Sequence, residues 1–293
     1  MIARRHALGL IGAALLLPGC SAKAVNVIRI GSTGSPENAT IAEIYALALE
    51  RGNIAVDRHM NLGNAQMVMA ATQRGEIDIY PEYVRTGATN LRETSLRANA
   101  VELYNEAKPF YEQRYGITWL TPSPLNDSPC LATSQYAAEE FWLLTLTKCA
   151  AIASQLRFAA TPDFLAPGGV LQRLQEYYGG FRFKKVFGCD PGTQYDMLSR
   201  GDAEVANAFT TDANIAEDQL IVLGDDKHFW PLYNVAPVIR LATVQSHPHV
   251  RFILNHISRT LTNYAIQQLN MRRDLLNMDP HDVAKDFVTA GTR

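Results

Sequence analysis

The strongest constraint on the fold is an alternation of strand-like and helix-like segments in the first third of the chain. Residues 25–31 and 77–80 are rich in valine and isoleucine, and residues 54–56 form a shorter apolar run. Between these runs, residues 64–74 and the segment that starts at Pro36 space their apolar side chains as a helix does. A β-α-β-α-β order predicts a parallel sheet with crossover helices, and therefore an α/β fold.

The loop that follows the first predicted strand is a candidate binding site. Ligands of parallel sheets bind beyond the carboxyl ends of the strands, and Ser32 and Thr33 lie there, just before a helix start. Backbone N–H groups at a helix start suit a polar or anionic ligand group. The loop has neither the spacing of a nucleophile elbow nor a Walker lysine. A plain strand-to-helix turn is the simpler interpretation.

The second half of the chain repeats part of the first half. Residues 194–209 align with residues 68–83 without a gap, so that Gly75 falls on Gly201 and Phe209 falls on Tyr83. Both segments predict a helix, a glycine stop, a short strand and an aromatic residue. The repeat predicts two lobes of similar design, with the two aromatic side chains on opposite walls of a cleft. Residues 250–290 have a helical pattern typical of packing helices.

The N-terminal residues predict export. A basic pair and an uncharged apolar stretch precede Leu17-Pro18-Gly19-Cys20, and such a pattern is typical of a signal peptide. We expect residues 1–19 to be a signal peptide and Cys20 to be a lipid anchor, with the protein held at the membrane in the periplasm or on the cell surface. An ordinary signal peptide with a chance cysteine is the alternative.

Charge and cysteine content exclude several classes of function. The formal net charge is −2, without the concentrated basic face that nucleic-acid binding requires. The remaining cysteines, Cys130, Cys149 and Cys189, have no zinc spacing, and the sequence does not choose a disulfide among them. His247 and His249 flank Pro248 in a turn and lack partners for a metal. We therefore expect no enzyme, no cofactor and no metal site.

Aromatic residues cluster where strands end or begin. Tyr80 and Tyr83 end the third predicted strand, Phe209 ends its counterpart, and residues 229–233 carry Phe, Trp and Tyr before another strand-like run. Aromatic faces attract a quaternary ammonium group by roughly 0.5–2 kcal/mol per well-placed ring. The pattern indicates a cation-binding box, with core packing as the alternative for each single ring.

These segments together resemble the glycine betaine, carnitine and choline binding proteins of osmoprotectant ABC importers. The most specific shared run is Glu76-Ile77-Asp78-Ile79-Tyr80-Pro81-Glu82-Tyr83, and the resemblance covers nearly all of the chain that would follow the signal peptide. The other shared runs are Ile30-Gly31-Ser32, Leu62-Gly63, Leu120-Thr121-Pro122, Thr211-Asp212 and Tyr233-Asn234-Val235-Ala236-Pro237.

The resemblance implies a type II periplasmic binding protein fold: two α/β lobes, a ligand cleft, and two crossover hinge strands. These crossovers are expected near residues 130–133 and 232–235. We expect residues 20–131 and 235–293 to form lobe 1 and residues 132–234 to form lobe 2. The expected partners are a small ligand and an ABC permease and ATPase complex, with the membrane reached through the lipid anchor only. We expect a monomer.

The resemblance also implies a set of ligand contacts. Tyr83, Phe209 and Tyr233 match residues of the aromatic box, and Thr86 matches a polar contact. The further candidates lie at or near positions where this chain departs from the family, and they are Ser32, Thr33, Arg85, Asp127 and Asp163.

Three departures set this chain apart from many members of that family. Thr33 stands where many have lysine, and Pro129 stands where many have a box aromatic. After Phe164, the arginine that many use for the ligand carboxylate is missing, while Arg85 stands where a small residue is usual. Losing charge-assisted hydrogen bonds costs about 1.5–3 kcal/mol each, which disfavours glycine betaine itself.

The predicted function is that of a solute-binding component of an importer for a quaternary amine. Two alternatives stay open at this point. One is the same fold with a different ligand, such as an amino acid or a sulfur-containing zwitterion. The other is a sensor or structural lipoprotein that has no part in transport.

Overall fold

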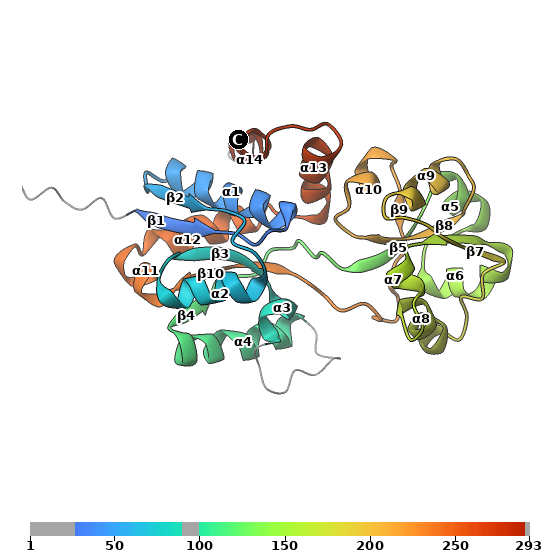
Figure 1. Cartoon of the computed structure of the whole chain (residues 1–293), viewed down its shortest axis with the longest axis horizontal. Helices are drawn as coiled ribbons and strands as arrows, with labels where there is room; N and C mark the ends of the chain where they lie inside the picture. The colour runs from blue at the N-terminus through green and yellow to red at the C-terminus, as the bar shows by residue number, and fades with distance from the viewer. Residues whose placement is uncertain (1–26, 90–99, 291–293) are drawn as a thin grey trace, which may run out of the picture.

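The protein consists of two α/β lobes, each built around a five-stranded sheet, and two chain segments cross between them (Figure 1). The computed structural model describes residues 27–89 and 100–290. Cys20 and residues 1–19 lie outside the described residues. None of the described helices is both long and apolar enough to cross a membrane.

The sheet of lobe 1 has the strand order β2-β1-β3-β10-β4. Strands β1, β2 and β3 run parallel, and β10 is antiparallel to both of its neighbours. The strands are β1 (Ile28–Gly31), β2 (Val56–His59), β3 (Ile79–Tyr83), β4 (Ile117–Trp119) and β10 (Val235–Arg240). The helices are α1 (Pro36–Arg51), α2 (Ala65–Arg74), α3 (Val84–Ala88), α4 (Ala100–Tyr115), α11 (Leu241–Ser246), α12 (His249–Ser258), α13 (Asn263–Asp274) and α14 (Pro280–Ala290).

The sheet of lobe 2 has the strand order β7-β6-β8-β5-β9. Its strands are β5 (Pro129–Thr133), β6 (Arg157–Ala160), β7 (Lys185–Gly188), β8 (Val205–Phe209) and β9 (Ile221–Val222). Its helices are α5 (Gln135–Phe141), α6 (Leu146–Ile152), the 3₁₀ helix η1 (Ala153–Gln155), α7 (Pro162–Leu165), α8 (Val170–Tyr178), α9 (Thr193–Ser199) and α10 (Ala213–Glu217).

The two sheets have the same design, which confirms the repeat predicted from the sequence. In each lobe a central strand, β3 or β8, lies between a parallel neighbour and an antiparallel strand that enters from a crossover. Strands β3 and β8 hold the predicted alignment, because Ile79–Tyr83 and Val205–Phe209 are the equivalent residues. Gly75 and Gly201 adopt φ of 72° and 71° after α2 and α9, the left-handed conformation that glycine adopts at low cost.

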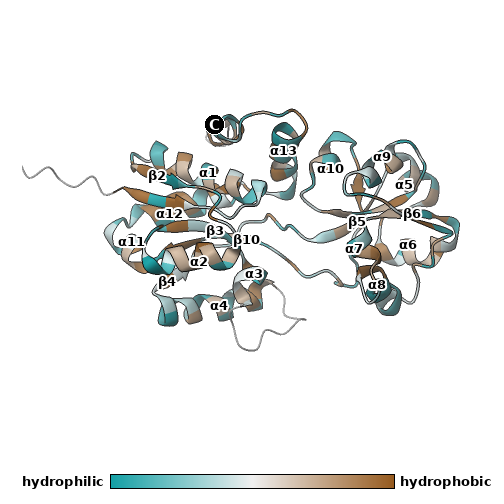
Figure 2. Ribbon diagram, in the orientation of Figure 1, coloured by the Kyte–Doolittle hydropathy of each residue, from teal (hydrophilic) through white to brown (hydrophobic). Residues whose placement is uncertain are grey.

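Helix α1 positions the first candidate loop. Ser35 caps its N-terminus by accepting a hydrogen bond from the N–H of Asn38, and Pro36 occupies the first turn. The apolar face predicted for this helix is buried and forms one core of lobe 1 with β1 and α12. Figure 2 shows hydrophobic strands in lobe 1 among helices that carry both hydrophobic and hydrophilic residues.

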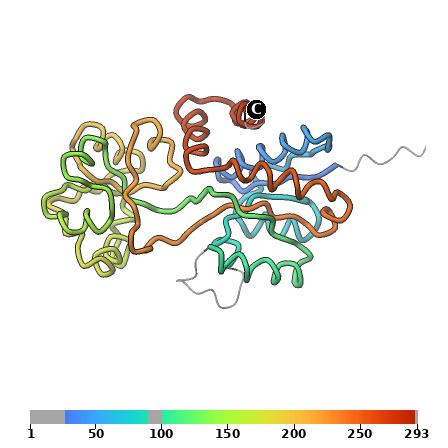
Figure 3. Tube along the Cα trace, turned by 180° about the vertical axis from the view of Figure 1, so that it is seen from behind, coloured from blue at the N-terminus to red at the C-terminus, as the bar shows by residue number. Residues whose placement is uncertain are grey.

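The two crossovers run side by side between the lobes (Figure 3). They span residues 120–128 and 223–234, and Asn126 and Asn234 form an antiparallel bridge between them. The lobe boundary expected between residues 131 and 132 falls inside β5, which pairs with β8 and β9. The second expected boundary coincides with the start of β10 at Val235.

Candidate functional site

The aromatic residues of the repeat both lie where a crossover meets a sheet. Tyr83 ends β3 and pairs with Val235 of β10, while Phe209 ends β8 and pairs with Pro129 of β5. Phe209 is 47% exposed, an exposure that a core residue would not have. Because the two strands are equivalent, each lobe presents one aromatic side chain at the same place.

The phenol of Tyr83 is held by a buried carboxylate. Its Oη donates a hydrogen bond to Oε1 of Glu37 at 2.5 Å. Burial raises the pKa of Tyr83 well above its usual value, and the nearby charges of Glu37 and Asp127 act in the same direction. The ring therefore stays a neutral phenol with a fixed orientation.

Tyr233 lies in the second crossover, beneath a cationic side chain. The guanidinium carbon of Arg85 lies 6.0 Å from the centre of the Tyr233 ring, within the range of a cation–π contact. The N–H of Tyr233 donates to Oδ1 of Asn126 at 2.6 Å, which joins the two crossovers. The guanidinium of Arg85 thus lies over one face of the Tyr233 ring.

Asp127 and Asp212 place carboxylates near the same region. Asp127 accepts a hydrogen bond from Oγ1 of Thr211 at 2.9 Å, and its N–H donates to the carbonyl of Tyr233. Burial raises the pKa of Asp127 to about 7, and the charge of Glu37 adds to the effect. Asp212 accepts from the Tyr195 hydroxyl and from the N–H of Phe209, and burial raises its pKa.

Ser32 and Thr33 belong to a tightly bonded loop. Ser32 is fully buried, and its Oγ donates to the carbonyl of Thr33 and accepts from the N–H of Asn61. The N–H of Thr33 donates to Oδ1 of Asn38. The Nδ2 of Asn38 donates in turn to the carbonyl of Pro81 in β3. These bonds fix the loop against the strand that ends in Tyr83.

The last two predicted contacts, Thr86 and Asp163, lie in helices of different lobes. Thr86 lines a small hollow of about 160 Å³ between α2 and α3, together with the buried Glu82. Asp163 is exposed in the first turn of the four-residue helix α7, while its neighbour Phe164 is buried in the core of lobe 2.

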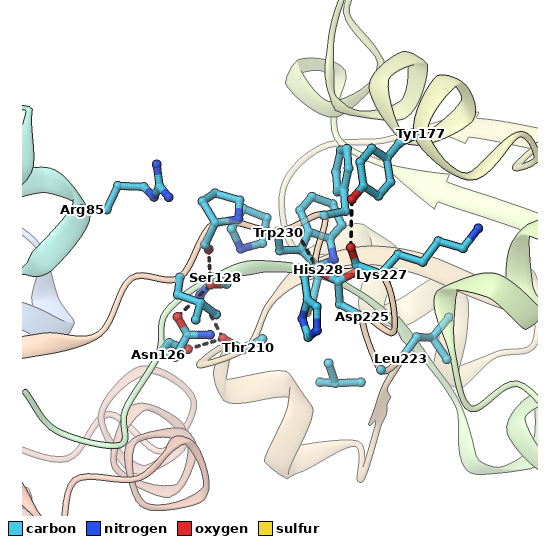
Figure 4. A pocket seen from close by; sticks show the side chains of 17 residues that line it. Arg85, Asn126, Ser128, Tyr177, Thr210, Leu223, Asp225, Lys227, His228 and Trp230 are labelled. Carbon is cyan, nitrogen blue, oxygen red and sulfur yellow. Dashed lines mark hydrogen bonds between the residues drawn. The ribbon is translucent and has the colours of Figure 1, made fainter. Parts of the chain in front are cut away.

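A cavity of about 740 Å³ lies beside the crossovers (Figure 4). Such a volume is within the range of small-molecule sites. Of the nine predicted contacts, Arg85 alone lines it; Ser128, Thr210 and Leu232 are lining residues that directly adjoin predicted contacts in the sequence. The cavity therefore lies next to several predicted contacts. The rest of its wall comes from residues 222–225 and 227–231 and from Asn126, Pro129, Cys130 and Tyr177.

The cysteines and acidic residues show no metal centre or disulfide in the part of the chain that is described. Cys130, Cys149 and Cys189 are free thiols. Within residues 27–89 and 100–290, no group of three or more His, Cys, Asp or Glu side chains could hold a metal ion.

Comparison with known proteins identifies the relatives of the chain. The family model described as the substrate binding domain of ABC-type glycine betaine transport system matches residues 26–290. A glycine-betaine-binding protein of Pseudomonas aeruginosa is 28% identical over 271 residues, which cover 89% of this chain and 86% of that protein.

A second relative is longer than this chain. The ergothioneine transport permease/ergothioneine binding protein EgtU of Helicobacter pylori is 28% identical over 280 residues. The match covers 95% of this chain and half of that protein. Among solved structures, apo YehZ from Escherichia coli superposes with a TM-score of 0.83 at 26% identity, covering 91% of this chain and 99% of that one.

Proposed function

This chain belongs to the family of substrate binding domains of ABC-type glycine betaine transport systems, and from that premise we propose that it captures a small quaternary ammonium solute between its two lobes. The expected type II periplasmic binding protein fold is confirmed, as is the expectation of a transport binding protein rather than an enzyme. The ligand, its contacts and the delivery of that ligand to a permease and ATPase are the parts that we propose.

The observation that carries the proposal is the placement of aromatic residues at the ends of equivalent strands. Tyr83 and Phe209 stand at the same position of the two lobes, and Tyr233 lies in the crossover between them. A quaternary ammonium group cannot donate strong hydrogen bonds, so a site recognises it through several aromatic faces. If both lobes contribute ring faces to the ligand, ligand binding would also favour the state in which the two lobes lie closer together.

Carboxylates near these rings support a cationic ligand group. Glu37, Asp127 and Asp212 form no ion pair with any described lysine, arginine or histidine. Buried or half-buried carboxylates without a counter-charge are costly, and a bound cation would offset part of that cost. This electrostatic argument favours choline and similar cations.

A bulkier zwitterion is a second candidate, and a specific departure favours it. Pro129 replaces a box aromatic and pairs directly with Phe209, so the wall at this point is smaller than an aromatic wall would be. The relative from Helicobacter pylori is named for ergothioneine, a zwitterion that is larger than glycine betaine. Arg85 is the basic residue that we assign to the carboxylate of such a ligand.

A thermal-shift panel of choline, glycine betaine, carnitine and ergothioneine tests the proposal. A ligand that binds only the folded protein stabilises it by about 2.7 kcal/mol at one hundred times its Kd, so a binder raises Tm by several degrees. Phe209→Ala should abolish most of the shift, because it removes an exposed ring from the proposed cleft. Phe252→Ala removes a ring that is 75% exposed on α12 and should leave the shift intact.

The outcome of the panel separates the two candidates. A shift with choline but not with ergothioneine supports the cation, and the reverse supports the larger zwitterion. No shift with any of the four at millimolar concentration would reject a quaternary ammonium ligand.

Export and a lipid anchor at Cys20 remain proposals from the sequence. A mass spectrum of the N-terminal peptide from a native membrane fraction tests them, because a thioether-linked lipid on Cys20 gives a characteristic mass. An unmodified N-terminus or an unprocessed leader would reject the anchor.

A further inference from the structure

Glu37 is a buried carboxylate that makes no ion pair with any described residue. It lies in the first turn of α1 and is 7% exposed. A helix N-terminus is an electrostatically favourable place for an acidic side chain. The side chain is nevertheless directed away from its own helix, because both of its oxygens accept hydrogen bonds from other elements.

The two oxygens of Glu37 serve different parts of the molecule. Oε1 accepts from the Tyr83 hydroxyl at 2.5 Å, and Oε2 accepts from Nδ2 of Asn270 at 2.9 Å. The same amide nitrogen of Asn270 also donates to the carbonyl of Thr211 at 2.9 Å. A continuous path of hydrogen bonds therefore leads from Tyr83 in lobe 1 to the segment that follows Phe209 in lobe 2.

Helix α13 carries Asn270 and two more amide side chains on the same face, and all three donate hydrogen bonds to lobe 2. Asn263, Gln267 and Asn270 are four and three residues apart, the spacing that places side chains on one side of a helix. Their amide groups all donate to the backbone carbonyls of Thr210 or Thr211. Helix α13 packs against α10 of lobe 2 and against α14, which in turn packs on α1 of lobe 1. The helix is thus a physical link between the lobes.

We propose that Glu37 is a positioning residue of the ligand cleft, which orients the ring of Tyr83 and joins it through Asn270 to the Thr210–Thr211 backbone of the opposite lobe. Glu37 does not touch the ligand in this scheme. Its role is to set the relative placement of two walls that the ligand contacts. The effect on affinity rests on the proposed function, whereas the link between the lobes is a property of the ligand-free protein.

The first experiment measures the link without a ligand, by hydrogen exchange of the whole protein. Glu37→Gln keeps the size of the side chain but removes its negative charge, so the hydrogen bonds with Tyr83 and Asn270 both lose their charge assistance. The new NH₂ group can only donate, so the Tyr83 hydroxyl has to change from donor to acceptor if the amide oxygen stays with Asn270. We expect peptides that cover residues 209–217 of lobe 2 to exchange at least about fivefold faster in this variant. Asp282→Asn, which removes an exposed first-turn carboxylate from α14, should leave these peptides unchanged.

The second experiment is a double-mutant cycle on the affinity for choline and for ergothioneine. Glu37→Gln and Tyr83→Phe should each weaken binding by about tenfold, the worth of one charge-assisted hydrogen bond. If Glu37 acts through Tyr83, the double variant should bind within about twofold of either single variant. If the double variant instead loses affinity by the product of the two single losses, Glu37 does not act through Tyr83, and the proposed positioning is wrong.

The two experiments distinguish the failure of this proposal from the failure of the proposed function. If the wild-type protein binds none of the four ligands of the thermal-shift panel, the quaternary ammonium function is rejected, and the exchange data alone decide the link. Faster exchange confined to α1 of the Glu37→Gln variant would show a local role in the helix and would overturn the link. Faster exchange in residues 209–217 with non-additive affinities would establish it.

Discussion

At the scale of single residues, Glu82 is the carboxyl group whose burial has the clearest consequence. It is 3% exposed in β3, and burial raises its pKa to about 8 even though Oε1 accepts a hydrogen bond from the N–H of Tyr83. In the unfolded chain its pKa returns to about 4.3. The folded protein therefore binds this proton more tightly than the unfolded protein, and stability contributed by the neutral form is lost as pH rises from about 4.3 through 8.

Glu82→Gln should remove this pH dependence. Glutamine keeps an acceptor for the Tyr83 N–H and carries no charge at any pH. Near pH 4 the free energy of unfolding of the variant should equal that of the wild type or lie slightly below it, because the new NH₂ group needs a hydrogen-bond partner. Between pH 5 and pH 9 its stability relative to the wild type should rise by about 2–4 kcal/mol.

Urea unfolding of the two proteins at pH 5, 7 and 9 measures the difference. The exposed Glu76→Gln variant is the control, because the pKa of Glu76 is lowered by its pairing with Arg74 rather than raised by burial. A gap between Glu82→Gln and wild type that stays constant with pH would contradict the assignment of a neutral, buried Glu82.

The candidate site was predictable from the sequence in some of its residues and not in others. Tyr83 and Phe209 were predictable because they occupy equivalent ends of a repeated strand, a local pattern. Glu37 and Asn270 were not, because their contact joins residues 233 positions apart through hydrogen bonds. Acidic residues are common in the first turn of helices, so the sequence around Glu37 does not reveal its hydrogen-bond partners.

At the scale of elements, the equivalent helix ends of the two lobes should respond alike to the same substitution. Gly75 and Gly201 both have φ near +70°, and an alanine there is strained whatever the space around it. Gly75→Ala and Gly201→Ala should each lower the free energy of unfolding by about 1 kcal/mol. The Gly75 variant should be affected at least as much, because a Cβ would lie 3.1 Å from the Arg240 guanidinium.

Thermal or urea unfolding of the two variants provides the measurement. Gly34→Ala is a suitable control, because Gly34 has no positive φ and its nearest neighbour is 3.8 Å from an added Cβ. The control should match the wild type within about 0.5 kcal/mol. Stability equal to wild type in both test variants would contradict the left-handed geometry of the helix ends.

The elements themselves were more predictable than their order in the sheets. The early helices lie where helical spacing predicted them, but β2 begins at the last residue of the predicted run 54–56, and β3 begins two residues after the predicted start at residue 77. The parallel pairing of β1 with β2 and β3 followed from the alternation of strands with helices. The insertion of β10 between β3 and β4 did not follow, since it brings residues 235–240 against a strand formed about 155 residues earlier. Only non-local burial and pairing decide that position.

At the scale of the whole molecule, the crossovers determine how freely the lobes move. Asn234 fastens one crossover to the other, because its Nδ2 donates to the carbonyls of Ser123 and Leu125 at 3.2 and 3.1 Å. We therefore expect the two crossovers to bend as a pair, because a hinge absorbs the change in geometry when two lobes close on a ligand.

Asn234→Ala should loosen this pair while leaving every proposed ligand contact in place. A wider range of lobe orientations lowers the population that is competent to bind, and the apparent Kd rises in inverse proportion to that population. We expect affinity for the ligand identified in the thermal-shift panel to fall about three- to tenfold. The radius of gyration should increase without ligand and should equal the wild-type value when the ligand is bound.

Small-angle X-ray scattering with and without ligand, together with calorimetry, measures both quantities. Asn255→Ala is the matched control: it removes the acceptor for the N–H of Thr121 at the start of the first crossover but leaves the crossovers joined to each other. A hinge role predicts that Asn255→Ala keeps wild-type scattering and affinity. A hinge limits the range of lobe orientations in the ligand-free protein, and ligand binding removes that range. A larger radius of gyration for liganded Asn234→Ala would therefore contradict the hinge role, because it would show that the joined crossovers stabilise the closed state instead.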